Sequence, residues 1–234
     1  MNNLNIAAVD QAINSRRSIR AFLSDRIPQE LIEEILAVAS RAPSGSNTQP
    51  WKVYAVTGQT RQRIIDAVCQ TQLDIQAHPD LAPNYVSSFD YYPKKWFSPF
   101  IERRRENGFG LYGLLGLSKD NKAGMAAQHL RNYQLFDAPV ALFFTTHQEL
   151  AVGAKMDVAM LMQNVMTAAQ ARGLATCPQA AWNHFHPIVL PLLGADANEE
   201  LVCAIALGYA DPNALVNEFI TPRVPVQDFT VFLD

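Results

Sequence analysis

The stretch LAVGAKMDVAMLMQNVMTAAQAR, residues 150–172, decides which fold this sequence predicts. It reads as one long helix whose apolar residues surround the axis almost completely instead of forming a single stripe. Gly173 follows it, in the position where a glycine favours a left-handed helix cap. Such a helix must be buried on several faces. We therefore expect it at the centre of the core or at an interface between subunits.

Outward from this helix, apolar strands alternate with further helices. The predicted strands cover residues 51–57, 140–146 and 201–208, with a short last strand at 226–233. The predicted helices cover residues 4–15, 28–41, 59–72, 96–107 and 119–136. Strands separated by helices predict a layered fold that is either α/β or α+β. No internal repeat or Gly/Ser-rich linker interrupts the pattern, so we expect residues 1–234 to form a single domain.

The composition excludes several classes of protein. Of 234 residues, 49% are hydrophobic and 18% charged, and 19 basic against 22 acidic residues give a net charge of −3. This balance is typical of a folded chain and argues against a dedicated nucleic-acid-binding protein, which is usually basic. No signal-peptide pattern opens the chain, and no apolar run approaches the roughly 20 residues of a membrane span. The odd number of cysteines, three, favours a reducing compartment, so we expect a cytoplasmic protein without a membrane partner.

A cluster of arginines lies at the end of the first predicted helix. Arg16, Arg17 and Arg20 fall within five positions around Ser18. Like charges this close repel one another, and guanidinium groups match phosphate oxygens in a bidentate manner. The cluster therefore indicates either an anion site or a basic turn exposed to solvent.

The loop APSGSNTQPW, residues 42–51, combines small hydroxyl residues, a glycine and two amides. Such a loop allows a flat polar ligand to approach the backbone closely, although a polar turn between a helix and a strand has the same composition. By itself it does not distinguish between the two.

Familiar catalytic and nucleotide-binding motifs do not fit. The sequence contains no GxSxG, Walker A or HExxH pattern. The spacing GxGxxG occurs at residues 108–113 but follows a charged helix instead of a strand, so it does not predict a dinucleotide-binding fold. Cys177, His184 and His186 make a poor zinc pattern, and we expect no metal and no cysteine nucleophile. The basic run at residues 103–105 is interpreted as a solvated helix face.

Taken in order, these segments resemble the FMN-dependent nitroreductase family over nearly the whole chain. They are RRSIR (16–20), APSGSNTQPW (42–51), the long apolar helix, GLATCPQAAW (173–182), LGYAD (207–211) and TPRVP (221–225). Their form is most similar to the bacterial nitrobenzoate-reductase branch. The resemblance implies an α+β fold with a central mixed sheet flanked by helices, in an intertwined homodimer.

The resemblance also implies which residues bind FMN. The phosphate and the pyrimidine edge are assigned to Arg16, Arg17, Ser18 and Arg20, with Arg223 as a further phosphate contact. The partner-facing loop matches Pro43, Ser44, Gly45, Ser46 and Asn47. The segment along the isoalloxazine ring matches Cys177, Pro178, Gln179 and Ala180, with a backbone N–H expected to point at N5. Some relatives carry a lysine where this chain has Thr221, which leaves phosphate neutralisation more to the N-terminal arginines.

The implied activity is the reduction of nitroaromatic or related electron-poor aromatic compounds with NAD(P)H, by ping-pong hydride transfer through FMN. No side chain is expected to act as a catalytic acid or nucleophile. Residues 79–116, rich in aromatic side chains, are expected to cover the substrate. Two alternatives stay open: reductive dehalogenation of halogenated aromatics such as halogenated tyrosine, and a flavin-binding protein without turnover.

Overall fold

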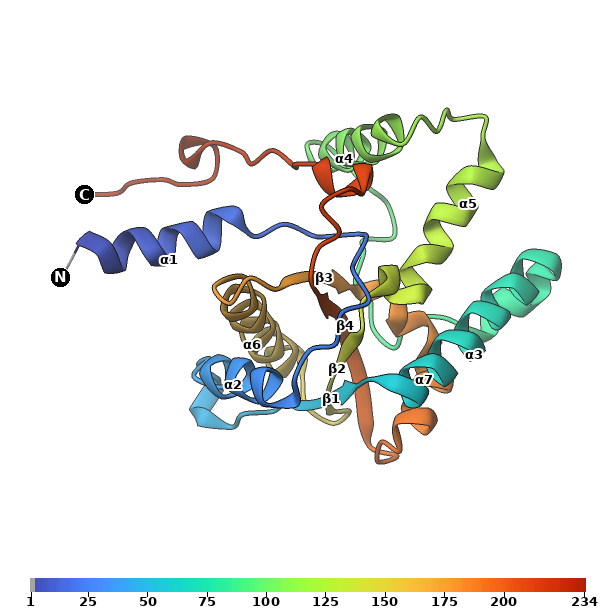
Figure 1. Cartoon of the computed structure of the whole chain (residues 1–234), viewed down its shortest axis with the longest axis horizontal. Helices are drawn as coiled ribbons and strands as arrows, with labels where there is room; N and C mark the ends of the chain where they lie inside the picture. The colour runs from blue at the N-terminus through green and yellow to red at the C-terminus, as the bar shows by residue number, and fades with distance from the viewer. Residues whose placement is uncertain (1–2) are drawn as a thin grey trace.

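A single four-stranded sheet forms the centre of the computed structural model, which describes residues 3–234 (Figure 1). Its strands are β1 (Lys52–Val56), β2 (Val140–His147), β3 (Ala175–Gln179) and β4 (Glu199–Gly208), in the order β1-β2-β4-β3. All three pairings are antiparallel. The α+β class is confirmed, whereas the sheet expected to be mixed is antiparallel within one chain, because the predicted strand at 226–233 does not pair there.

Helices cover both faces of this sheet. Side chains alternate along β2, so that Val140, Leu142 and Phe144 face one core while Ala141 and Phe143 face the other. On the first face pack α2 (Gln29–Ala39) and α6 (Val152–Gln170), and on the second pack α3 (Gly58–Ala77) and α7 (His186–Leu193). The central strands are therefore buried on both sides, which explains their nearly continuous apolar sequence.

Two elements, β3 and α7, were not predicted from the sequence because both contain proline. β3 contains Pro178 and α7 contains Pro187 and Pro191. Proline lacks a backbone N–H, so it argues against a central strand or a helix interior. Pro178 is tolerated because β3 is an edge strand, and Pro187 because it lies in the first turn of α7.

The remaining helices lie above the sheet and at the chain ends. They are α1 (Asn3–Ser15), α4 (Phe100–Leu114) and α5 (Lys122–Leu130). The helix predicted at 96–107 is shifted because it begins after Pro99 and runs through Gly108, Gly110 and Gly113. The helix predicted at 119–136 is shorter, because the chain turns into a 3₁₀ segment, Arg131–Asp137, in which Leu135 and Phe136 have positive φ.

Both ends of the chain project from the same side of the molecule (Figure 1). The strand predicted at 226–233 is wrong for the single chain, where only the 3₁₀ turn Val226–Asp228 forms. Phe229, Val231 and Phe232 are exposed by 66%, 80% and 84%. A β-strand needs a neighbouring edge for its hydrogen bonds, and within residues 3–234 this segment pairs with none.

A carboxylate network ties together the ends of β1, β2 and β4. Glu199 Oε1 accepts hydrogen bonds of 2.7 Å from Lys52 Nζ and of 2.7 Å from the Tyr54 hydroxyl. Its Oε2 accepts a 2.6 Å hydrogen bond from Thr145 Oγ1. Burial by itself would raise the pKa of Glu199, but the hydrogen bonds from Lys52, Thr145 and Tyr54 outweigh it and lower the pKa to about 2.

We expect Glu199→Gln to lower the melting temperature by several degrees at pH 7. The negative charge of Glu199 strengthens its hydrogen bonds from Tyr54 and Thr145, and charge-assisted hydrogen bonds of such partly buried groups contribute about 1.5–3 kcal/mol. The exposed Lys52 adds little, because solvent screens its charge. Because the folded-state pKa is depressed, the stabilisation is complete above the unfolded value of 4.5 and is lost as the pH falls towards about 2. Thermal unfolding at pH 7 and pH 3 should therefore show a difference from wild type that shrinks in acid. Glu149→Gln, at an exposed carboxylate, is the control; a difference independent of pH would contradict this account.

Candidate functional site

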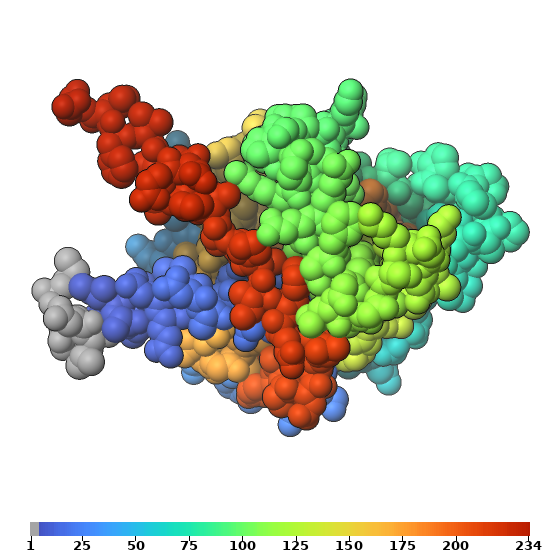
Figure 2. All heavy atoms as spheres, turned by 90° about the horizontal axis from the view of Figure 1, so that it is seen from above, coloured from blue at the N-terminus to red at the C-terminus, as the bar shows by residue number. Residues whose placement is uncertain are grey.

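The two ends of the chain meet at one cavity of about 880 Å³, which we call the arginine cavity. In Figure 2 the segment after residue 210, in orange-red, lies between α1 in blue and α4 in green. Four of the residues that line the cavity are arginines: Arg16, Arg17, Arg20 and Arg223. The structure thus brings together residues that are about 200 positions apart in sequence but were predicted to share one ligand.

No carboxylate lines the arginine cavity, and within residues 3–234 none of its four arginines forms an ion pair. Partial burial lowers the pKa of the Arg16 guanidinium, and the nearby charge of Arg223 lowers it further. The two guanidinium groups therefore repel each other across the cavity. An anion bound between them would remove this repulsion, so the alternative of a merely solvated basic turn is less favourable.

A short parallel pairing holds the arginine segment against β3. The backbone N–H of Ile19 donates a 3.0 Å hydrogen bond to the carbonyl of Thr176, and Ser18 forms an isolated bridge with Thr176. This pairing places Arg16 and Arg20 close enough to Cys177 for their charges to act on its thiol.

Asn217 fixes the same segment from the other side, and the sequence analysis did not identify it. Its Oδ1 accepts hydrogen bonds from the backbone N–H of Arg20 (2.8 Å) and of Ala21 (3.2 Å). Its Nδ2 donates to the carbonyls of Ala21 (2.8 Å) and Asp211 (3.0 Å). This one amide therefore holds the arginine segment against the chain that leads to Arg223. Nothing in the residue type or its spacing indicates this role, because the partners are brought together only by the fold.

The segment predicted to lie along the flavin ring is divided between two environments. The side chains of Cys177 and Gln179 are buried, and Gln179 Nε2 donates a 2.7 Å hydrogen bond to the carbonyl of Asn132. Pro178 and Ala180 instead line a second, mostly apolar cavity of about 390 Å³ beside α6. Any contact of Gln179 with a ligand would therefore have to come from its backbone.

The buried thiols are unsuited to nucleophilic chemistry. Burial raises the pKa of Cys177 to about 11, although Arg20 and Arg16 counteract this, and raises the pKa of Cys203 to about 12. Both are therefore protonated thiols at neutral pH, and the thiolate is the reactive form. The described residues, 3–234, also contain no group of three or more His, Cys, Asp or Glu side chains placed to hold a metal ion.

The loop at residues 43–47 lies apart from the arginine cavity of its own chain. None of its residues lines that cavity, and the backbone N–H of Gly45 donates a 3.1 Å hydrogen bond to Asp157 near the start of α6. Ser46 and Asn47 have positive φ, so their backbone forms a tight turn beside an exposed part of α6.

The segment predicted to cover the substrate, residues 79–116, is anchored to the core by a buried amide. Asn183, which is 2% exposed, accepts a 2.7 Å hydrogen bond from the backbone N–H of Ser88 and donates to the carbonyl of Leu201. From this anchor Phe89 and Tyr91 reach the apolar cavity beside α6. The predicted cover thus has a fixed point against the sheet.

The residues at the arginine cavity fit a phosphorylated ligand of the size of a mononucleotide. Guanidinium groups and the Ser18 hydroxyl supply charged and neutral donors, and about 880 Å³ lies within the range of small-molecule cofactor sites. The donor set is complementary to a phosphate in charge, and the segment predicted to contact the flavin ring adjoins it through Cys177.

Comparisons with known proteins agree with this chemistry. A model of the Nitroreductase family matches residues 13–209. The chain is 36% identical to a protein named 4-nitrobenzoate reductase from Nocardioides sp. (strain LMS-CY), over 97% of this chain and 91% of the relative. It superposes with a TM-score of 0.90 and 34% identity on the FMN- and NADPH-dependent nitroreductase NfnB from Sphigopyxis sp. strain HMH, covering 97% and 99% of the two chains. The FMN-dependent nitroreductase NfnB from Mycobacterium smegmatis, solved in complex with NADPH, gives a TM-score of 0.90 at 29% identity, covering 98% and 99% of the two chains.

Among the described residues, no helix has the length and apolar character to cross a membrane.

Proposed function

The chain belongs to the nitroreductase family, and from this we propose that it is an FMN-dependent oxidoreductase that reduces nitroaromatic or related electron-poor aromatic compounds with NAD(P)H. The observation that carries the proposal is the arginine cavity, in which Arg16, Arg17, Ser18, Arg20 and Arg223 converge without a carboxylate. When bound there, FMN supplies the hydride and electron transfer. The protein's own residues bind the cofactor, orient it and exclude water.

We assign the individual roles as follows. Arg16 and Arg223 neutralise the phosphate, and Arg20, which like Arg16 lies close enough to Cys177 for its charge to act on the thiol, borders the ring segment. A cation at this edge stabilises negative charge that develops on a reduced ring system. The backbone from Cys177 to Ala180 positions the ring, and Asn217 positions the arginine segment.

We further propose that the active protein is a homodimer with two shared sites. Three elements on one side of the molecule expose apolar side chains that a single chain leaves uncovered. They are Ile6, Val9 and Ile13 of α1, Val152, Met156 and Met160 of α6, and Val226, Phe229, Val231, Phe232 and Leu233 near the C-terminus. Exposed apolar area of this extent is typical of a protein–protein interface.

The sheet supports the same assembly. The outer side of β3 is occupied by the Ile19 hydrogen bond, whereas the outer edge of β1 has no backbone partner within residues 3–234. We propose that the C-terminal tail, defined as residues 225–234, adds to the β1 edge of a second copy, which would make that sheet five-stranded. The loop at residues 43–47 would then complete the flavin site of the partner subunit. This explains why it lies away from the arginine cavity of its own chain.

The proposed activity is tested by the cofactor and by an acceptor panel. We expect the purified protein to be yellow and to release FMN, not FAD, on denaturation. Oxidation of NADPH or NADH should be stimulated by p-nitrobenzoate and far less by iodotyrosine. Preference for iodotyrosine would favour dehalogenation, and bound FMN without turnover on any acceptor would favour a flavin-binding protein. Release of FAD, or no flavin after reconstitution, would refute the assignment.

A further inference from the structure

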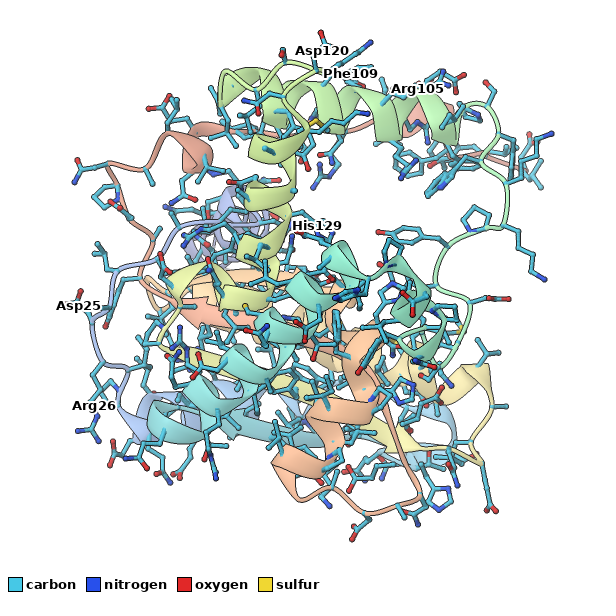
Figure 3. The ribbon with its side chains drawn as sticks, turned by 90° about the vertical axis from the view of Figure 1, so that its right-hand side faces the viewer. Asp25, Arg26, Arg105, Phe109, Asp120 and His129 are labelled. Carbon is cyan, nitrogen blue, oxygen red and sulfur yellow. The ribbon has the colours of Figure 1, made fainter. Side chains whose placement is uncertain are left out.

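The outer side of α4 carries a cavity that the proposed flavin site does not use. Its volume is about 580 Å³, and we call it the α4 pocket. It lies between α4, the turn that follows this helix and the start of α5. Its principal lining residues are Arg104, Arg105, Asn107, Phe109, Tyr112 and Lys119. Figure 3 labels Arg105 and Phe109 on α4, at the end of the molecule farthest from the sheet in that view.

Three cations line the α4 pocket, and no carboxylate does. Within residues 3–234, Arg104, Arg105 and Lys119 form no ion pair. Two of them lie over aromatic rings instead: Arg104 is 5.1 Å from the Trp96 ring centre, and Lys119 Nζ is 4.6 Å from that of Phe109. The positive charge of the pocket is therefore not neutralised by the protein. All three arginines of residues 103–105 are exposed, as predicted for a solvated helix face, and Arg104 and Arg105 also line the pocket.

The same pocket offers flat apolar surfaces. The Phe109 side chain is 54% exposed, and Tyr112, Leu117 and Met125 complete the apolar part of the wall. Exposed aromatic faces next to cations bind planar rings by stacking. The ligand that fits both features carries a planar aromatic group and a strongly anionic group close to it.

The α4 pocket is joined to the arginine cavity through α4 itself. Asn107 lines both cavities. α4 is also held against the segment that leads to Arg223, because a Cβ on Gly110 would lie 2.7 Å from the Phe219 ring. An elongated ligand that extends past Asn107 therefore reaches from one cavity into the other. A dinucleotide has this form.

We propose that the α4 pocket binds the adenosine 2′-phosphate end of NADPH, with the adenine on the aromatic wall and the phosphate held by Arg104, Arg105 and Lys119. The proposal rests on the proposed function, since it places the adenosine end of the proposed reductant, NADPH, in the α4 pocket. NADH lacks the 2′-phosphate. The 2′-phosphate is dianionic and meets three cations that form no ion pair within the protein. The enzyme therefore prefers NADPH to NADH.

Binding without turnover tests the pocket directly. Calorimetric titration of the FMN-loaded wild-type protein with 2′,5′-ADP should show binding, and 5′-AMP should bind about tenfold more weakly or worse. Arg105→Ala and Lys119→Ala should each weaken 2′,5′-ADP about tenfold, as expected for loss of a charged hydrogen bond. The matched control is Arg103→Ala, which removes the same charge from the same helix but from outside the pocket. It should leave the affinity unchanged.

Kinetics supply the second readout. In the Arg105→Ala and Lys119→Ala variants, kcat/KM for NADPH should fall about tenfold while kcat/KM for NADH changes less than twofold. Three results would overturn the proposal: no binding of 2′,5′-ADP to folded wild-type protein, equal losses for both reductants, or a change confined to the KM of p-nitrobenzoate, which would place the acceptor in the pocket. A protein that binds 2′,5′-ADP but fails the acceptor panel would instead refute the proposed function and leave the pocket intact.

Discussion

Removing the C-terminal tail is expected to cost the protein its dimer and its bound FMN together. In the single chain this segment makes little contact with its own core, and Phe232 and Leu233 are 84% and 90% exposed. If the tail pairs with the β1 edge of a second copy, its deletion exposes the apolar faces of both subunits. It also removes the support for Arg223, which lies just before the tail. The expected products are monomers or aggregates without flavin.

A pair of substitutions tests the same point without shortening the chain. Val231→Asp with Phe232→Asp places two charges where the interface is expected and should dissociate the dimer. Leu73→Asp, at a 45% exposed leucine on α3, is the control and should leave the assembly intact. Sedimentation and flavin absorbance are the measurements. Obligate dimers bury more than about 2,000 Å², so the thermal stability of the wild type should rise with protein concentration. A folded, FMN-loaded monomer at low micromolar concentration would refute the shared site.

The sequence predicts the central elements of this fold because their local patterns agree with their surroundings. Residues 140–146 and 201–208 are continuous apolar runs, and they form the two inner strands, buried on both faces. The apolar helix at 150–172 appears as α6, with one face against the sheet and Met156 exposed. A strand or helix that is buried in the core carries a high proportion of apolar residues in its own sequence. The burial of these elements could therefore be predicted from the sequence alone.

What could not be predicted depends on contacts between distant segments. β3 carries Pro178 and would be rejected as a central strand, but it lies at an edge, which only the topology decides. Asn217 is an ordinary polar residue until the fold places it beside Arg20 and Ala21. Arg104 and Arg105 differ from Arg103 only in which side of α4 faces the pocket. In each case the role of the residue depends on which residues the fold places beside it, and the local sequence does not show this.

The expected result for Arg16→Ala and Arg223→Ala is a loss of FMN affinity of roughly tenfold or more for each variant. A charged hydrogen bond contributes about 1.5–3 kcal/mol, which corresponds to this factor. Titration of the apoprotein with FMN, followed by flavin fluorescence, measures the change. Arg41→Ala, at an exposed arginine outside the arginine cavity, should bind FMN as the wild type does.

The repulsion between Arg16 and Arg223 predicts that Arg223→Ala affects stability differently with and without FMN. Because the charge of Arg223 lowers the pKa of Arg16, Arg223→Ala should leave the apoprotein at least as stable as the wild type. With FMN present, the same substitution should lower the melting temperature, since stabilisation by a ligand depends on its affinity for the folded state. A purely structural arginine would reduce stability in both states. Equal destabilisation with and without FMN, or wild-type affinity in both variants, would therefore remove these two residues from the phosphate site.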